Sequence, residues 1–152
     1  MKYFTAVDPG MFTSNMGLAT FEDGKLTWSR SISFKKHKTF SEKVDSEEFY
    51  EFLVTLGGYT VVEESFYQGI ANKYHQRLLG IIQYTSNVME TIAPLSVKKL
   101  VTGSGKATKY KMKVAVKKQL SKAEQKLVDF KDEDAVDAVA IGLAYMKREK
   151  ES

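Results

Sequence analysis

The order of strand-like and helical patterns along the chain limits its fold more than any other feature. Three strand-like segments come first, at residues 2–7, 16–21 and 26–34, and the Glu22-Asp23-Gly24 turn joins the second to the third. An Asp-Gly pair between apolar segments is a strong hairpin signal. Two further strands, at residues 60–63 and 95–101, alternate with helical patterns. This order predicts an α/β fold with a mixed five-stranded sheet flanked by helices.

The helical patterns cover residues 45–56, 72–91, 108–120 and 134–147. Asp45 or Ser46 can cap the first helix, and Pro94 stops the second, which is the longest. No repeat, low-complexity tract or long linker divides the 152 residues. A chain of this length is expected to form a single domain, residues 1–152.

Four acidic residues occupy positions where the local pattern favours apolar side chains: Asp8, Glu63, Asp134 and Asp137. Asp8 and Glu63 each end an apolar strand, and the other two are three residues apart on one helix face. Each has an ordinary structural explanation when taken singly. Asp8 can begin an Asp-Pro-Gly turn, Glu63 or Glu64 can lie at a solvated strand end, and Asp134 can favour the positive end of its helix.

Taken together, carboxylates at the ends of buried elements repel one another unless they are protonated or bridge cations. The chain has no Cys and only two His residues, His37 and His75, so metal sites built from thiolates or several imidazoles are excluded. Oxygen ligands alone favour a hard cation, Mg²⁺ or Mn²⁺. The sequence therefore predicts a carboxylate cluster that binds one of these cations.

The net charge of +4 conceals a lysine-rich block. Residues 98–126 contain ten Lys and a single acidic residue, Glu124, which is a balance of +9. One interpretation is a solvated helix face. The other is a surface for a polyanion such as nucleic acid, because neutralising phosphates releases condensed counterions. Lysines beside a carboxylate cluster favour phosphodiester chemistry over a small-molecule substrate.

Contact with a membrane is not expected. The lysine block has few bulky apolar residues to insert into a lipid surface, and no apolar run approaches 18 residues. The N-terminal strand runs directly into Asp8 without a basic segment or a long apolar segment before it. These features predict a soluble, cytoplasmic protein.

Four segments, in this order along the chain, resemble those of one nuclease family: Ala6-Val7-Asp8-Pro9-Gly10, Val61-Val62-Glu63-Glu64-Ser65-Phe66, Gly103-Ser104-Gly105-Lys106-Ala107-Thr108-Lys109, and Asp134-Ala135-Val136-Asp137-Ala138-Val139-Ala140-Ile141. The sequence resembles the RuvC-type Holliday junction resolvases, particularly their small phage-encoded branch, whose fold is like that of RNase H. The likeness extends from residue 2 to about residue 146, nearly the whole chain.

The resemblance implies a role for each segment. Asp8, Glu63, Asp134 and Asp137 would hold two divalent metals, Mg²⁺ with Mn²⁺ able to substitute. Phe66 together with Tyr67 would stack on bases at the centre of the junction, although a core aromatic is the alternative for Phe66. The lysines implied to contact phosphates are Lys106, Lys109, Lys111, Lys113 and Lys117. The helix at 72–91 would form a homodimer, unless its apolar stripe packs entirely on the sheet.

The resemblance also has departures. Of the glycines that the family carries in the helix after the Glu–Phe segment, only Gly80 has an equivalent, and Glu64 is an extra acid beside Glu63. The expected function is a structure-selective endonuclease that cuts Holliday junctions, forks and flaps, in the host cytoplasm if it is phage-encoded. The alternatives are a branched-DNA-binding module that does not cut, and another RNase H-like nuclease that acts on RNA-containing substrates.

Overall fold

A computed structural model describes residues 3–10, 15–65 and 68–152 of the chain. The elements follow one another in this order: β1 (Tyr3–Asp8), β2 (Asn15–Glu22), β3 (Lys25–Ser33), α1 (Phe40–Val44), α2 (Glu47–Thr55), β4 (Tyr59–Glu63), α3 (Ile70–Thr85), β5 (Val88–Ile92), α4 (Pro94–Thr102), α5 (Lys109–Gln119), α6 (Lys122–Gln125) and α7 (Glu133–Glu151). No helix among these residues is both long enough and apolar enough to cross a membrane.

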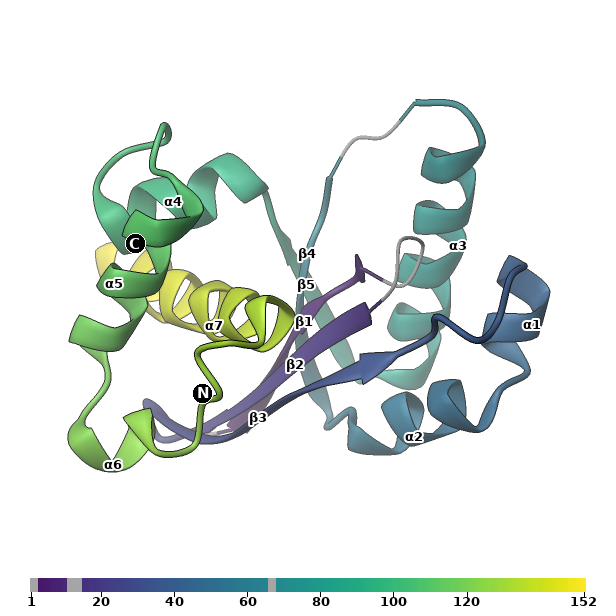
Figure 1. Ribbon diagram of the computed structural model, residues 1–152, viewed down its shortest axis with the longest axis horizontal. Helices are drawn as coiled ribbons and strands as arrows, with labels where there is room; N and C mark the ends of the chain where they lie inside the picture. The colour runs from purple at the N-terminus through teal and green to yellow at the C-terminus, as the bar shows by residue number, and fades with distance from the viewer. Residues whose placement is uncertain (1–2, 11–14, 66–67) are drawn as a thin grey trace.

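The five strands form one mixed sheet in the order β3-β2-β1-β4-β5, with helices on both faces (Figure 1). β2 pairs antiparallel with β1 and with β3, whereas β4 pairs parallel with β1 and with β5. Asp23 and Gly24 both have positive φ, 51° and 82°, as the tight turn between β2 and β3 requires. The expected fold class and hairpin are therefore confirmed.

The fifth strand lies at a different place from the one expected. The prediction of a strand at residues 95–101 is wrong, because this segment belongs to helix α4. The predicted helix at residues 72–91 is also too long at its end, because α3 ends at Thr85. Pro94 is in the first turn of α4, where its missing N–H costs no hydrogen bond. Residues 88–92 instead extend as β5, whose full length pairs with β4. Pairing in the sheet overrides the helical spacing there.

Two apolar clusters cover the two faces of the sheet. Side chains alternate along each strand, so Ala6 and Val61 belong to the cluster under α7, whereas Val7 and Val62 belong to the cluster under α2 and α3. Figure 1 shows α4, α5 and α7 grouped on one side of the sheet and α1, α2 and α3 on the other. The carboxyl ends of β1 and β4 thus lie between the two layers of helices that cover the sheet.

The N-terminal turn of α7 approaches the sheet closely at Gly17. Gly17 pairs with Asp8 of β1 on one side and with Ser31 of β3 on the other. A Cβ atom on Gly17 would collide with the backbone carbonyl of Asp134. The absence of a side chain at position 17 is therefore what lets α7 reach the row of residues that includes Asp8.

Gly17→Ala is expected to lower the free energy of unfolding by about 1–3 kcal/mol, because the added methyl group overpacks a site lined by backbone. Urea denaturation of the purified variant measures this change. Gly80→Ala is the matched control, since a Cβ there meets no heavy atom within 4 Å, and it should not destabilise the protein. Unchanged stability of Gly17→Ala would contradict the close approach of α7.

Candidate active site

Asp8 and Glu63 lie at the same edge of the sheet because they end neighbouring parallel strands. Val7 pairs with Val62 in the β1–β4 register, so Asp8 and Glu63 follow side by side. Strand alternation places both on the face that α7 covers, since Ala6 and Val61 belong to the cluster under α7. Both carboxylates are half-buried.

Helix α7 brings the other two carboxylates to this edge. Asp132 caps the helix by accepting a hydrogen bond from the Ala135 N–H at 3.2 Å, and it also accepts one from Ser31 Oγ at 2.6 Å. Asn15 Nδ2 donates to Asp134 Oδ2 at 3.2 Å. Ser31 lies on β3 and Asn15 on β2, so two strands hold the first turn of α7 in place.

The four carboxylates influence one another strongly. Burial, followed by the negative charges of Glu63, Asp137 and Asp134, raises the pKa of Asp8 from 3.8 to about 8. Burial and the charge of Asp137 raise the pKa of Glu63 to about 7. Burial raises the pKa of Asp137 to about 6. It also raises the pKa of Asp134, which the hydrogen bond from Asn15 opposes. The structure thus brings the four predicted carboxylates into one cluster.

Two lysines face this cluster from different helices. Lys109, at the start of α5, has its pKa raised first by the charge of Asp137 and lies 3.6 Å from Glu133 Oε2. The charge of Lys98, on α4, lowers the pKa of Glu63 against the effect of burial. Both lysines line a cavity of about 190 Å³ together with Glu63 and Asp137. Cationic and anionic side chains therefore share one opening beside the sheet.

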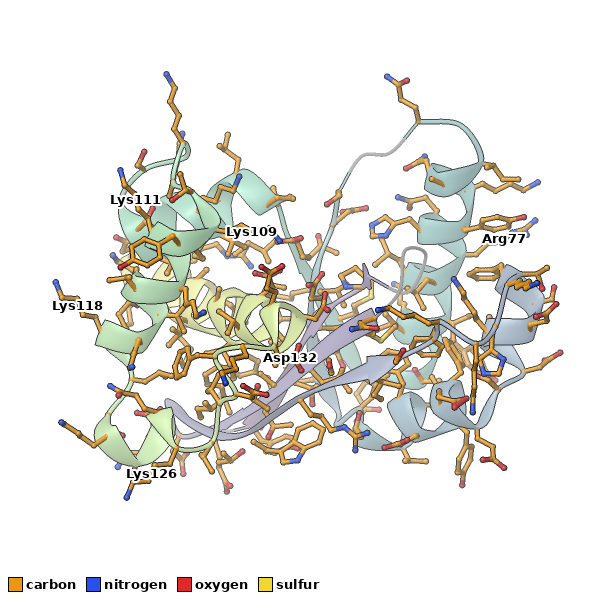
Figure 2. The ribbon with its side chains drawn as sticks, in the orientation of Figure 1. Arg77, Lys109, Lys111, Lys118, Lys126 and Asp132 are labelled. Carbon is orange, nitrogen blue, oxygen red and sulfur yellow. The ribbon has the colours of Figure 1, made fainter. Side chains whose placement is uncertain are left out.

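The remaining lysines of the block are divided between different surfaces. Lys113 lines a neighbouring cavity of about 230 Å³ with Lys109 and Asp137. Lys106 and Lys111 line a separate groove between α4 and α5, and Lys117 Nζ lies 5.5 Å from the centre of the Phe130 ring. Figure 2 shows Lys109 on the side of α5 toward the sheet, whereas Lys111 and Lys118 project from the other side. Only part of the predicted lysine set is thus adjacent to the carboxylates.

Sequence reasoning did not single out Lys98 or Asn15 as site residues. Lys98 belongs to the lysine block, but the strand predicted at residues 95–101 did not indicate that its side chain lies near Glu63. Asn15 carried no signal of its own. Phe66 and Tyr67, expected to stack on bases, lie outside the described residues.

The structure separates Glu63 from its neighbour Glu64. Glu63 lines the cavity with Asp137, whereas Glu64 accepts a hydrogen bond from Gln76 Nε2 of α3 at 3.5 Å. Adjacent strand residues point to opposite faces, which explains why only one of the two acids reaches the cluster. Of the two acids, Glu63 is therefore the one that shares a cavity with Asp137.

The four carboxylates have the oxygen ligands that a hard cation prefers, but they are not arranged as a complete metal-coordination site. Across residues 3–10, 15–65 and 68–152, no group of three or more Asp, Glu or His side chains stands in a metal-holding arrangement. The four acids nevertheless supply only oxygen ligands, which Mg²⁺ and Mn²⁺ prefer. Burial is the first cause that raises the pKa values of Asp8, Glu63 and Asp137, so their ionised forms are disfavoured even with Lys98 and Lys109 nearby. A divalent cation would stabilise those forms.

A mixed five-stranded sheet with acids converging at one edge, beside a lysine-lined cleft, is typical of the RNase H-like class of nucleases. Comparison with known proteins narrows this class. Residues 57–145 match the family model described as "Crossover junction endodeoxyribonuclease RuvC". The chain is 32% identical over 124 residues to the RuvC of Aliarcobacter butzleri, covering 82% of this chain and 70% of that protein.

Two solved structures share the fold. Thermus thermophilus RuvC in complex with a Holliday junction substrate superposes with a TM-score of 0.75 at 18% identity, covering 100% of this chain and 97% of that one. The Fowlpox virus resolvase, in complex with substrate Holliday junction DNA, has a TM-score of 0.57 at 17% identity, covering 97% of this chain and 98% of that one.

The chain belongs to the RuvC family of crossover junction endodeoxyribonucleases, which resolve Holliday junctions in DNA recombination and repair. Nucleases of this family are in general Mg²⁺-dependent. The expected family, fold and enzyme class are thereby confirmed.

Without metal, the protein is expected to lose stability as the pH rises from about 4 to about 8. Asp8 has a folded-state pKa of about 8 and an ordinary value of 3.8, so in this range the folded state binds more protons than the unfolded state. Asp8→Asn removes this titration. At pH 8 in EDTA it should be more stable than wild type by at least about 1.4 kcal/mol, the free energy equivalent to one pKa unit.

Urea denaturation at pH 5 and pH 8 measures both effects. Asp23→Asn, in the exposed β2–β3 turn, is the matched control and should keep the wild-type pH dependence. If the Asp8→Asn variant were less stable than wild type at pH 8, the raised pKa of Asp8 would be refuted.

Proposed function

We propose that this chain cuts Holliday junctions, forks and flaps at a centre formed by Asp8, Glu63, Asp134 and Asp137. The observation that carries the proposal is the convergence of these acids, from β1, β4 and α7, beside Lys98 and Lys109. Burial, together with the negative charges of the other three acids, raises the pKa of Asp8 to about 8, and such perturbed groups in a cleft are typical of functional sites.

In this proposal the four carboxylates hold divalent metal, Mg²⁺ with Mn²⁺ able to substitute. Two bound ions would supply an activated water as nucleophile and stabilise the charge on the phosphate and the departing 3′ oxygen. The protein's own contribution is to keep the acids at one edge of a rigid sheet. Asp132 and Ser31 fix the first turn of α7, so that Asp134 and Asp137 meet the strand ends.

Lysines beside the acids would bind the DNA backbone. Lys98, Lys109 and Lys113 line the cavities that also contain Asp137, and in our proposal they neutralise phosphates next to the scissile bond. Lys117 lies on the same face of α5 as Lys109 and Lys113, beside the Phe130 ring that lines their cavity, and would contact phosphates there. Lys111, and Lys106 just before α5, line a separate groove and would contact phosphates along a DNA arm. Phe66 and Tyr67 follow Glu63 by three and four residues, and in our proposal they stack on bases at the crossover.

Two copies of the chain would act together as a homodimer through α3. The stripe of His75, Leu78, Leu79 and Ile82 is buried against the sheet and is not available to a partner. A second face remains exposed, with Ile70 66% and Tyr84 91% accessible and Arg77 between them at seven-residue spacing. Residues seven apart lie on one helix face, so this face could pair with its copy.

We propose that the chain belongs to the phage-encoded branch of the family, which its four segments resemble, and a viral resolvase is among its structural neighbours. An enzyme of that origin would act in the cytoplasm of the host cell. Its substrate would be the branched DNA itself, with no small-molecule substrate.

Digestion of an end-labelled synthetic four-way junction tests the activity, the metal and the dimer together. With Mg²⁺ or Mn²⁺ the wild-type protein should nick two strands of like polarity at symmetric positions. Asp8→Asn should reduce cutting by at least about 10³-fold, because it removes a proposed metal ligand, while junction binding is retained. Single, unpaired nicks would contradict the dimer.

Linear duplex and RNA–DNA hybrid of matching sequence serve as controls and should be cut poorly. Preferential cutting of the hybrid would favour an RNase H-like activity on RNA-containing substrates. Junction binding without nicking at any concentration of Mg²⁺ or Mn²⁺ would favour a non-cleaving binding module.

Lys109→Ala is expected to weaken junction binding by about tenfold, or about 1.4 kcal/mol, because the lysine faces the phosphates nearest the carboxylates. The slope of log K against log salt should also fall by about 1, as for one lost phosphate contact. Fluorescence anisotropy in the Asp8→Asn background measures both without cleavage. Lys126→Ala, at the exposed end of α6 and outside these cavities, is the matched control (Figure 2). Equal losses in the two variants would refute a specific role for the cleft.

A further inference from the structure

Asn15 holds one of the four carboxylates directly. It begins β2, on the strand next to Asp8, and its Nδ2 donates a hydrogen bond to Asp134 Oδ2 at 3.2 Å. The side chain lies outside the four segments that carry the family resemblance. Its contact with Asp134 therefore identifies Asn15 as a further residue of the site, one that the four motifs do not include.

Chemistry fixes the orientation of this amide. An ionised carboxylate only accepts hydrogen bonds, so the Nδ2 group and not Oδ1 must face Asp134. Among the described residues, Asn15 Oδ1 is buried and has no hydrogen-bond partner. An unpaired buried oxygen is costly, and a water molecule or a hard cation in the site would satisfy it.

The backbone holds Asn15 in its position from two directions. It pairs with Ser33 of β3, and its carbonyl lies so close to Gly10 that a Cβ on Gly10 would collide with it. The other oxygen of Asp134, Oδ1, lies 3.7 Å from where that Cβ would be. Asn15 thus holds Oδ2 while Oδ1 faces Gly10, two residues after Asp8.

We propose that Asn15 is a positioning residue for Asp134, and that it presents Asp134 Oδ1 to a divalent cation shared with Asp8. The inference rests on the proposed metal-dependent function. Hydrogen bonds behind a ligand set its orientation, and their loss typically lowers metal affinity or activity by about 10- to 100-fold. Asn15 acts through Asp134, so its loss weakens metal binding without removing the ligand.

The test compares Asn15→Ala and Asn15→Asp with wild type. Isothermal titration of the DNA-free protein with Mn²⁺ measures metal affinity apart from activity. Asn15→Ala should bind Mn²⁺ about 10-fold more weakly, and excess Mn²⁺ should restore its cleavage rate to nearly that of wild type. Asn15→Asp is similar in shape but has no donor for Asp134, so it should not restore the geometry. Its kcat for junction cleavage should fall while its KM stays unchanged.

Three controls separate the possible outcomes. Ser33→Ala, at the paired position on β3, should behave as wild type in every assay. Asp134→Ala should lose cleavage that excess Mn²⁺ does not restore, which distinguishes a lost ligand from a misplaced one. If wild type binds Mn²⁺ and cuts junctions while both Asn15 variants match it, the role of Asn15 is refuted. If wild type neither binds Mn²⁺ nor cuts, the proposed function itself fails.

Discussion

The close packing of α7 against Gly17 is the contact on which the carboxylate cluster depends. It sets Asp134 and Asp137 beside acids that end β1 and β4, at the edge of a sheet buried on both faces. Burial, and after it the charges of the neighbouring acids, disfavours ionisation and raises the pKa of Asp8 to about 8. The fold therefore maintains a site that is electrostatically unfavourable until positive charge enters it.

The rest of the structure supports this arrangement from several sides. The parallel pairing of β1 with β4 aligns Asp8 and Glu63. Asp132 links the first turn of α7 to Ser31 of β3. At the other end of the helix, Arg148 donates to the Thr91 carbonyl at 3.3 Å and so ties α7 to β5. A helix fixed at both ends to a sheet can hold charged groups against their mutual repulsion.

Positive charge next to the cluster is distributed by helix geometry rather than by sequence position. Lys109 and Lys111 are two residues apart on α5, yet one lines the carboxylate cavity and the other lines a groove between α4 and α5. Residues two apart on a helix do not share a face. A uniform block of lysines in the sequence thus becomes two surfaces, of which one faces the acids.

The sequence by itself determined the α/β class and the β2–β3 hairpin, and it singled out the four acids that the structure brings to one edge of the sheet. These follow from local chemistry: strand alternation, an Asp-Gly turn, and acids where apolar residues belong. Only the tertiary structure decided that residues 88–92 are the fifth strand, that Lys98 therefore lies on a helix facing Glu63, and that Asn15 contacts Asp134. Each depends on contacts between segments distant along the chain, and residues 15 and 134 meet only because strand pairing and helix packing bring them together.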